Sequence, residues 1–219
     1  EAAYVSGSVS TDLVFQYEVE ADDEDTNGIT ITAPTISLNG GTMTDVNGDV
    51  VLSFVMPSTA AVLVDAVAPT VVGSPTGPIA GSYSNAAADI LTITVVMSEA
   101  VTVDDTVGTP TIPLTIGGQV RNADYFSGTE TTTLVFRYTI ASDTDVYANG
   151  TFTVGDINTA GGTIQDAEGT DADLTGYSAP TPSGVLINRA GPTITVTDGD
   201  TETSVAGDII ELTATYLHD

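Results

Sequence analysis

Residues 125–140 have the sequence YFSGTETTTLVFRYTI, and residues 4–19 have the related sequence YVSGSVSTDLVFQYEV. The match extends without a gap over residues 1–49 and 122–170 at a constant offset of 121, and 18 of the 49 aligned positions are identical. Glycine and aspartate at turns are among the identities, and such residues are placed by backbone geometry rather than by general polarity. The chain therefore contains an internal repeat, from which its fold is predicted.

The repeat continues beyond this match with a small change of offset. The sequence VLVDAVAPT at 62–70 aligns with VLINRAGPT at 185–193, an offset of 123, and ADILTITVVMS at 88–98 aligns with GDIIELTATYL at 207–217. The chain is thus expected to begin and end inside repeats of about 121–123 residues, within an array longer than these 219 residues.

Three domains are predicted from these boundaries. Residues 1–66 form the C-terminal part of one immunoglobulin-sized repeat, residues 67–190 form a complete repeat, and residues 191–219 form the N-terminal part of the next. Pro69 and Pro192 occupy equivalent places at the two junctions between repeats. Because proline fixes φ and holds the preceding residue in an extended conformation, we expect short, stiff connections.

The hydrophobic pattern predicts β-strands. Apolar residues alternate with threonine and charged residues at period two, which is typical of half-buried antiparallel strands. The predicted inward-facing residues are Leu91, Ile93, Val95 and Met97 in one strand; Leu134, Phe136, Tyr138 and Ile140 in a second; and Leu13, Phe15, Tyr17 and Val19 in its repeat partner. Roughly seven to nine strands per repeat are expected, as in a Greek-key sandwich. The predicted fold class is all-β, with tandem antiparallel β-sandwich repeats.

Composition limits the partners. The chain has 30 acidic residues, 3 basic residues and a formal charge of −27, so it lacks the basic clusters that bind nucleic acid or anionic lipid. The hydrophobic fraction of 41% and its periodic arrangement favour a folded chain over a disordered one,. No apolar run reaches the roughly 18 residues of a membrane span, so no membrane insertion is expected in this segment. Divalent cations are the expected counter-partners.

Carboxylates gather in the predicted turns, where they suit calcium, which takes about six to eight oxygen ligands. The predicted calcium ligands are Asp22, Asp25, Asp45, Asn47, Asp49, Asp65, Glu99, Asp143, Asp145, Asp166 and Asp171. DVNGD at 45–49 lacks the glycine spacing of an EF-hand and is predicted to be a turn. Glu99 is expected to end the strand over 90–97 and to reach toward Asp65. The alternative is that Asp and Asn accept hydrogen bonds from their own backbone.

Catalysis is not expected. The chain has one histidine, no cysteine and no lysine, so the pattern offers no nucleophile–base pair. Paired carboxylates serve glycoside hydrolysis in other proteins, but here they fall in turns that are duplicated between repeats. Duplicated turns are typical of architecture rather than of an active site.

Several motifs recur in one order: Y-x-S-G, LVF-x-Y, GGT-x-x-D-x-x-G and V-L-[VI]-[DN]-x-x-x-P-T, followed by a strand that leads into SEAV at 98–101. This combination resembles the immunoglobulin-like tandem repeats of giant prokaryotic cell-surface proteins, which include surface-layer proteins and marine adhesins. The resemblance covers essentially the whole chain. It implies secretion to the cell surface and a role as calcium-stiffened spacers or lattice tiles. Asn188-Arg189 replaces Asp65-Ala66 at the second junction and departs from this pattern.

The expected function is structural. The first expectation is a tile of a surface layer (S-layer), in which the repeats pack against neighbouring repeats and copies of the same chain. The alternatives are a spacer in the stalk of a giant calcium-dependent adhesin and, third, a carbohydrate-binding module. Divergence of the repeats to 18 identities in 49 positions favours the tile, since each repeat of a lattice makes its own contacts.

Overall fold

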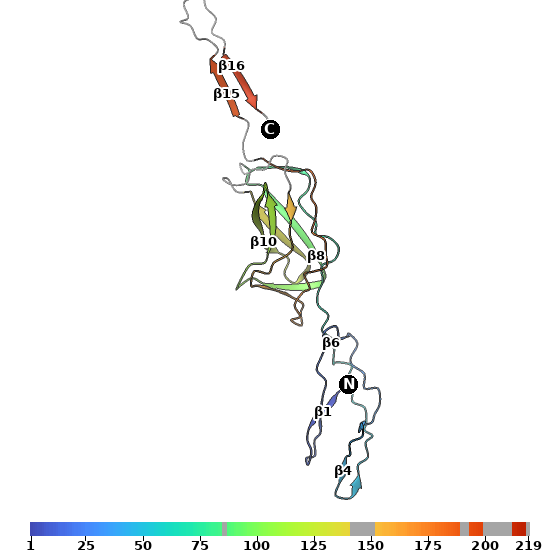
Figure 1. Cartoon of the computed structure of the whole chain (residues 1–219). Coiled ribbons are helices and arrows are strands. Elements are labelled where there is room, and N and C mark those ends of the chain that lie inside the picture. Colours follow the sequence, from blue (N-terminus) through green and yellow to red (C-terminus); the bar gives the residue numbers. More distant parts are fainter. Residues whose placement is uncertain (85–86, 141–151, 189–192, 199–211, 218–219) are drawn as a thin grey trace, which may run out of the picture. The chain divides into compact units, whose positions relative to one another are not determined.

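The computed structural model describes residues 1–84, 87–140, 152–188, 193–198 and 212–217 (Figure 1). None of the described residues is helical, so the described chain is all-β, as predicted. In the same residues, no helix has the length and apolarity needed to cross a membrane.

The chain divides into two compact units. The first is Glu1–Ala68 with Glu168–Thr170, and the second is Pro69–Ala167 with Asp171–Asp219. The division near Pro69 lies close to the first predicted junction, while the three domain boundaries at 1–66, 67–190 and 191–219 stay predictions.

The first unit consists of short antiparallel strand pairs. Its strands are β1 (Ala3–Ser6), β2 (Val14–Gln16), β3 (Glu24–Asp25), β4 (Thr44–Asp45), β5 (Gly48–Asp49) and β6 (Val64–Asp65). β1 pairs with β2, β3 with β6, and β4 with β5. The last pair closes through Val46 and Asn47, so the DVNGD segment forms a hairpin turn, as predicted.

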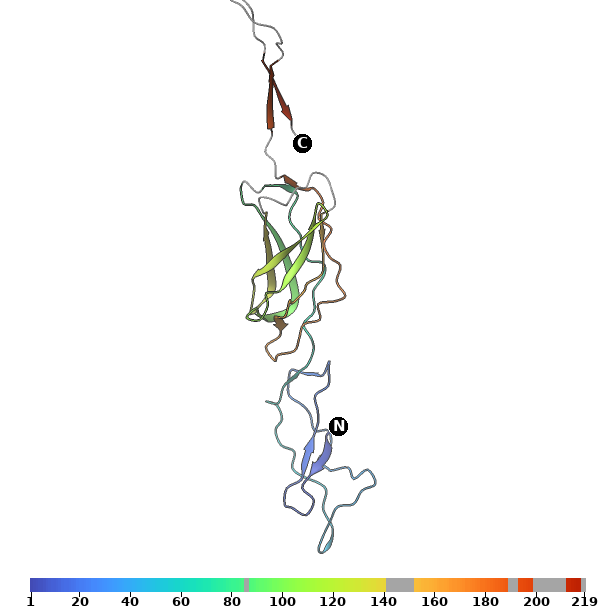
Figure 2. The same ribbon diagram turned by 60° about the vertical axis from the view of Figure 1, so that its left-hand side comes forward.

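The second unit is built on one six-stranded sheet (Figure 2). The described strands of this unit are β7 (Gly81–Ser84), β8 (Ile90–Asp104), β9 (Thr111–Ile116), β10 (Gln119–Ser127), β11 (Thr131–Thr139), β12 (Thr153–Val154), β13 (Thr163–Gln165), β14 (Val185–Asn188), β15 (Thr193–Asp198) and β16 (Leu212–Leu217). The sheet has the order β12-β9-β10-β11-β8-β13, and its pairs are antiparallel. β14 pairs separately with β7 and runs parallel to it.

β8 is longer than the sequence pattern predicts. It spans 15 residues and continues to Asp104, so the prediction that the strand ends at Glu99 is wrong. The first part of β8 pairs with β11, and its last three residues pair with β13. Between the two parts the register shifts at a β-bulge, because Val96 faces Thr133 but Val101 faces Thr131,. β8 is thus one continuous strand that lies between β11 and β13 in the sheet.

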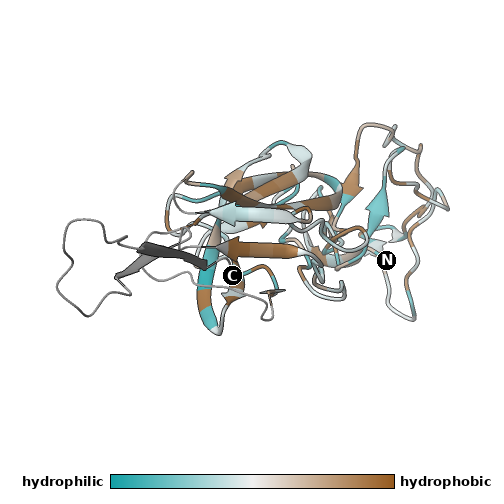
Figure 3. Ribbon diagram, turned by 90° about the horizontal axis from the view of Figure 1, so that it is seen from above, coloured by the Kyte–Doolittle hydropathy of each residue, from teal (hydrophilic) through white to brown (hydrophobic). Residues whose placement is uncertain are grey.

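The core of the second unit is formed by the predicted inward faces. Leu91, Ile93, Val95, Leu134 and Phe136 are 0% exposed, and Met97 and Ile140 are 2% and 3% exposed. Tyr138 is partly buried against the same cluster. Figure 3 shows apolar segments, in brown, on strands of the described chain. The period-two alternation of the sequence is therefore confirmed in β8 and β11.

The equivalent face of the first unit is open. Leu13, Phe15, Tyr17 and Val19 are 36% to 49% exposed, whereas their counterparts on β11 are buried or partly buried. The physical difference lies in strand pairing, since β11 lies between β10 and β8 while β2 pairs only with β1 in the described sheets. The prediction of an inward face holds for the second unit only.

Candidate functional site

The hairpins of the two units repeat in structural detail. β1 and β2 pair as Ala3↔Gln16, Tyr4↔Phe15 and Ser6↔Val14, with a bulge after the tyrosine. β10 and β11 pair as Asp124↔Arg137, Tyr125↔Phe136 and Ser127↔Val135, with the bulge at the same place. Each of these pairs is the other shifted by 121 positions. The sequence repeat is thus a repeat of backbone geometry.

Ring and turn geometry repeat as well. The ring centroids of Tyr4 and Phe15 are 5.8 Å apart at an interplanar angle of 67°, and the counterpart pair on β10 and β11 has 5.9 Å and 71°. Gly7 has φ +111° and Gly128 has φ +118°. A Cβ on Gly128 would lie 2.0 Å from the carbonyl oxygen of Thr133, so glycine is required at this position,.

The C-terminal hairpin repeats the opening of the second unit. β15 (Thr193–Asp198) and β16 (Leu212–Leu217) are antiparallel, with Ile194 opposite Tyr216. In the sequence alignment this pair corresponds to Val71 and Met97, which form an antiparallel bridge in the second unit. The same backbone pairing therefore starts two successive repeats.

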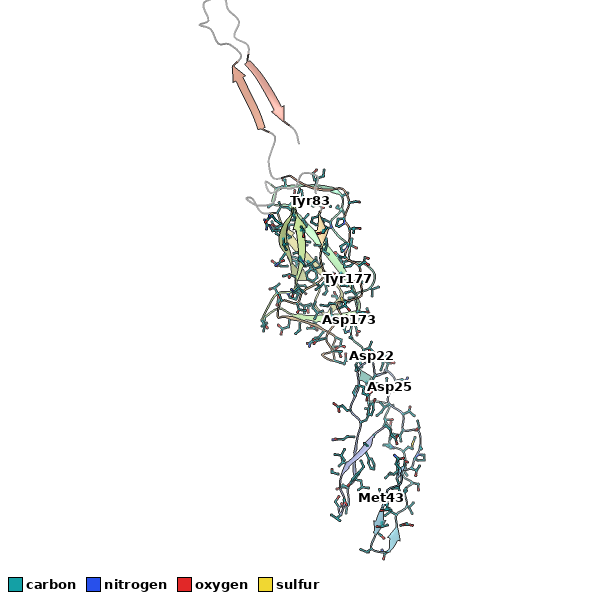
Figure 4. All side chains as sticks on the ribbon, in the orientation of Figure 1. Asp22, Asp25, Met43, Tyr83, Asp173 and Tyr177 are labelled. Atoms are coloured by element: carbon teal, nitrogen blue, oxygen red, sulfur yellow. The ribbon has the colours of Figure 1, made fainter. Side chains whose placement is uncertain are left out.

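The first acidic turn lies at the β3–β6 pair, where two acidic residues face each other. In the β3–β6 pair, Glu24 lies directly opposite Asp65, and like charges directly opposite on adjacent strands destabilise a sheet. The turn is held by the backbone, because the N–H of Asp22 donates to the carbonyl of Ala66 at 3.0 Å. Asp22 and Asp25 lie close together in this part of the unit (Figure 4). A bound cation would relieve the repulsion in this turn.

Asp23 is already engaged in the same turn. Its Oδ2 accepts the hydroxyl of Tyr17 at 2.6 Å and the N–H of Glu20 at 2.9 Å. These hydrogen bonds lower the pKa of Asp23. The hydrogen bond to the carboxylate favours the neutral phenol and raises the pKa of Tyr17 to about 12,. Asp23 is not among the predicted calcium ligands, and its carboxylate is instead the hydrogen-bond acceptor of Tyr17.

The second acidic turn is the β4–β5 hairpin. The N–H of Asn47 donates to Asp45 Oδ1 at 2.7 Å, and the Asn47 amide lies 3.4 Å from Asp45 Oδ2. The backbone hydrogen bond from Asn47 lowers the pKa of Asp45. Asp49 lies on β5 opposite Thr44 and is exposed. The turn brings the predicted ligands together, and Asp45 uses its carboxylate to close the turn.

The counterpart turn in the second unit differs in burial. Asp166 is 3% exposed, whereas its repeat partner Asp45 is exposed. Asp171 forms a β-bridge with Gln165, and its Oδ1 accepts the Gln165 side-chain amide at 2.9 Å. The structure therefore places Asp166 and Asp171 at one turn, with only Asp166 in the interior.

Several of these carboxylates accept a hydrogen bond from a backbone N–H of their own turn. Five aspartates accept the backbone N–H of the residue two positions later: Asp25, Asp45, Asp65, Asp104 and Asp173. This confirms, for these five, the alternative that aspartate bonds to its own backbone. Within the described ranges, no group of three or more carboxylate or imidazole side chains is gathered closely enough to hold a metal ion. Calcium binding stays a prediction.

The remaining predicted ligands lie apart. Glu99 is half-buried within the bulged part of β8. It belongs to the second unit and Asp65 to the first, so their pairing stays a prediction. Asp143 and Asp145 lie outside the described residues.

Two contacts were not predicted from the sequence. The Tyr177 hydroxyl accepts the N–H of Ile157 at 2.7 Å and thereby ties two loops of the second unit together. The Arg137 guanidinium carbon lies 3.6 Å from the centroid of the Phe126 ring, a cation–π contact,. Gln16 and Val5 occupy the repeat-equivalent positions, so comparison of the repeats gave no signal for this pair.

Comparison of the chain with protein-family models, with curated proteins and with solved structures found no match.

Proposed function

We propose that this chain is a structural extracellular module of a surface-layer or similar cell-surface assembly, built from immunoglobulin-like β-sandwich repeats. The observation that carries the proposal is the recurrence of one hairpin, with the same register, bulge and ring geometry, in two successive units. An array of one folded unit is a way to cover or to extend a surface.

The features that recur in both repeats are ones that shape the fold. The tyrosine–phenylalanine pair and the turn glycine recur, as do Ser6 and Thr11, while several other polar residues of the hairpin change. Asp12 corresponds to Thr133, and Glu18 corresponds to Thr139. A binding site carried by every repeat would need the same polar side chains in each copy. The recurrent part of each unit therefore serves folding, and the variable surface serves contacts that differ between repeats.

We include calcium in the proposed function because the chain is strongly acidic. A formal charge of −27 produces strong self-repulsion,, and the β3–β6 pair places Glu24 opposite Asp65. A divalent cation at this pair would neutralise both carboxylates and stiffen the turn next to the first junction. A calcium site occupied at about 100 times its dissociation constant adds about 2.7 kcal/mol to stability.

Sedimentation velocity with millimolar calcium and then with chelator tests this function. Large, reversible assemblies that appear as sheets by electron microscopy support the surface layer. A monomer that only becomes more compact supports the adhesin-stalk alternative. No response to chelation contradicts the calcium part of the proposal.

A matched pair of variants locates the cation. Asp65→Asn removes one of the two facing carboxylates and is expected to weaken the calcium response. Asp104→Asn is the control, because Thr106 donates to Asp104 Oδ1 through both its N–H and its hydroxyl. Equal responses from the two variants would contradict a site at the β3–β6 pair.

A further inference from the structure

The outer face of the main sheet in the second unit is open. One set of alternating residues on its strands forms the core, and Leu91, Phe136 and Ala123 of this set are 0% exposed. The residues between them point to the opposite side of the sheet, because successive side chains alternate in a strand. On β8, β11, β10 and β9 these outer residues are Ile90, Thr92, Thr94 and Val96; Thr133, Val135, Arg137 and Thr139; Val120, Asn122, Asp124 and Phe126; and Thr111, Pro113 and Thr115. None of them is buried, so the described part of the second unit leaves this outer face uncovered.

The openness of the outer face does not depend on where the chain begins or ends. Its strands lie within residues 90–139, which the structure describes without a gap. Each of the four strands has a paired neighbour on both sides in the six-stranded sheet. The exposed residues therefore belong to a complete sheet and not to an unpaired strand.

The outer face carries no net charge. Its charged residues are Asp124 on β10 and Arg137 on β11, which lie directly opposite each other in the register of the two strands. The whole chain carries −27 and has three basic residues. Most surfaces of two copies therefore repel each other, whereas two copies of this face do not.

The neutral face is a feature of the second repeat. Asp12 of the first repeat stands in the place of Thr133, and no basic residue compensates it. Glu18 likewise stands in the place of Thr139, and Gln16 replaces the arginine. The two repeats share the hairpin but differ in the charge of its outer side, as expected of a surface that makes a contact of its own.

Exposed apolar residues accompany the charged pair on the outer face. Phe126 is 56% exposed, and Ile90, Val96 and Val120 are exposed as well. The Arg137 guanidinium carbon lies 3.6 Å from the centroid of the Phe126 ring, and this cation–π contact holds the positive charge on the face,. Burial of the apolar area against a second neutral face is favourable and brings no like charges together.

We propose that the outer face is an interface between copies of this chain, and that its occupant is the same face of a second copy. The two copies are related by a two-fold axis that runs parallel to the strands, between β10 and β11. Rotation about this axis places β11 of one copy over β10 of the other at the same height along the strands. Arg137 of each copy then faces Asp124 of the other, and the two contacts are equivalent, as in an isologous interface. The inference deepens the proposed function, on which it rests for the role of self-assembly, by naming the face through which copies make lateral contact.

The size of the outer face sets the strength of the contact. Sheets that pack face to face lie about 10 Å apart, with their strands within about 30° of parallel. Four strands about 4.8 Å apart, with about seven residues each at about 3.3 Å, give a face of about 400 Å². This is about half of the roughly 800 Å² that each partner buries in an interface of standard size. A single pair of copies is therefore expected to bind weakly, and the contact suits an array in which each copy has several neighbours.

Two charge-reversing variants test the contact between Arg137 and Asp124. Arg137→Asp places carboxylates opposite each other across the interface, and Asp124→Arg places guanidinium groups opposite each other. Each variant alone is expected to self-associate at least about tenfold more weakly than the unaltered chain, because like charges across an interface repel. An equimolar mixture of the two variants is expected to recover the association, since each new charge then meets an opposite charge on the other variant. Recovery in the mixture cannot arise within one chain, so it separates an interface from an effect on folding.

Sedimentation equilibrium of the 219-residue chain in chelator, up to millimolar protein concentration, measures these associations. The unaltered chain is expected to show a monomer–dimer equilibrium. Asp105→Arg is the matched control, because it changes the net charge by the same amount as Asp124→Arg at an exposed residue just after β8, outside the outer face. It is expected not to weaken the association. A chain that stays monomeric, equal weakening by the two aspartate variants, or a mixture that does not recover overturns the proposal.

The apolar part of the contact has its own pair of variants. Phe126→Ala is expected to weaken self-association by about tenfold, as truncation of a central aromatic residue does at an interface. Val107→Ala is the control, because Val107 is exposed but does not belong to the outer face. Equal effects of the two variants contradict the proposed face. A chain that is monomeric in chelator but forms sheets with calcium would leave the proposed function standing while this inference fails.

Discussion

Phe136→Ala and Phe15→Ala form a matched pair, because the two residues are repeat counterparts in different degrees of burial. Phe136 is 0% exposed and packs edge-to-face against Tyr125 at 5.9 Å. Truncation of a buried phenylalanine costs about 3–5 kcal/mol, since it removes transfer free energy and leaves a cavity. Phe15 is 36% exposed. A fully buried side chain of this kind contributes about 1.5–3 kcal/mol of transfer free energy, and Phe15→Ala removes roughly two thirds of it without leaving a closed cavity. We therefore expect Phe15→Ala to cost about 1–2 kcal/mol.

Urea unfolding followed by far-ultraviolet circular dichroism measures both costs. With a slope of about 1–3 kcal/mol per molar urea, Phe136→Ala is expected to lower the midpoint of the second unit by more than about 1 M. At the same slope, Phe15→Ala is expected to lower the midpoint of the first unit by a smaller amount, because its cost is only about 1–2 kcal/mol. A cost below about 1 kcal/mol for Phe136→Ala, or equal costs for the two variants, would refute the burial assigned to Phe136 and the exposure assigned to Phe15.

Three further predictions address the turns and the titrating groups. Gly128→Ala is expected to destabilise the β10–β11 hairpin by about 1–3 kcal/mol in urea unfolding, because φ is +118° and the new Cβ meets a backbone oxygen, while Gly118→Ala, with open space around it, is the milder control. Spectrophotometric titration is expected to show that Tyr17 titrates late, with a pKa of about 12; Asp23→Asn removes the carboxylate acceptor and should lower that pKa, and an unchanged titration would contradict the hydrogen bond. The hydrogen bonds to Asp104 lower its pKa below the ordinary 3.8, so the stability it contributes is complete above its unfolded pKa and is lost as pH falls through the lower folded pKa, which carboxyl chemical shifts measured by nuclear magnetic resonance against pH can check.

The sequence predicts where the acidic turns lie, but it does not predict which groups their carboxylates contact. The turn at 45–49 follows from local sequence and from the repeat, whereas the pairing of Glu24 with Asp65 was not predicted. Burial of Asp166 does not follow, because its counterpart Asp45 is exposed. Whether a carboxylate closes its own turn or faces a neighbour depends on which strands meet there, and that pairing is set by residues far apart in the chain.

The sequence by itself determined the strands and their faces. Period-two alternation identified the buried residues of β8 and β11, and the 121-residue offset identified two equivalent segments, which the structure shows as hairpins of the same register and bulge. These features are local, since they depend on side-chain alternation and on glycine at positive φ. The tertiary structure alone decided where β8 ends and which faces are covered. Those outcomes depend on non-local pairing, because β8 continues to Asp104 to meet β13, and β2, the repeat counterpart of β11, pairs only with β1 in the described sheets.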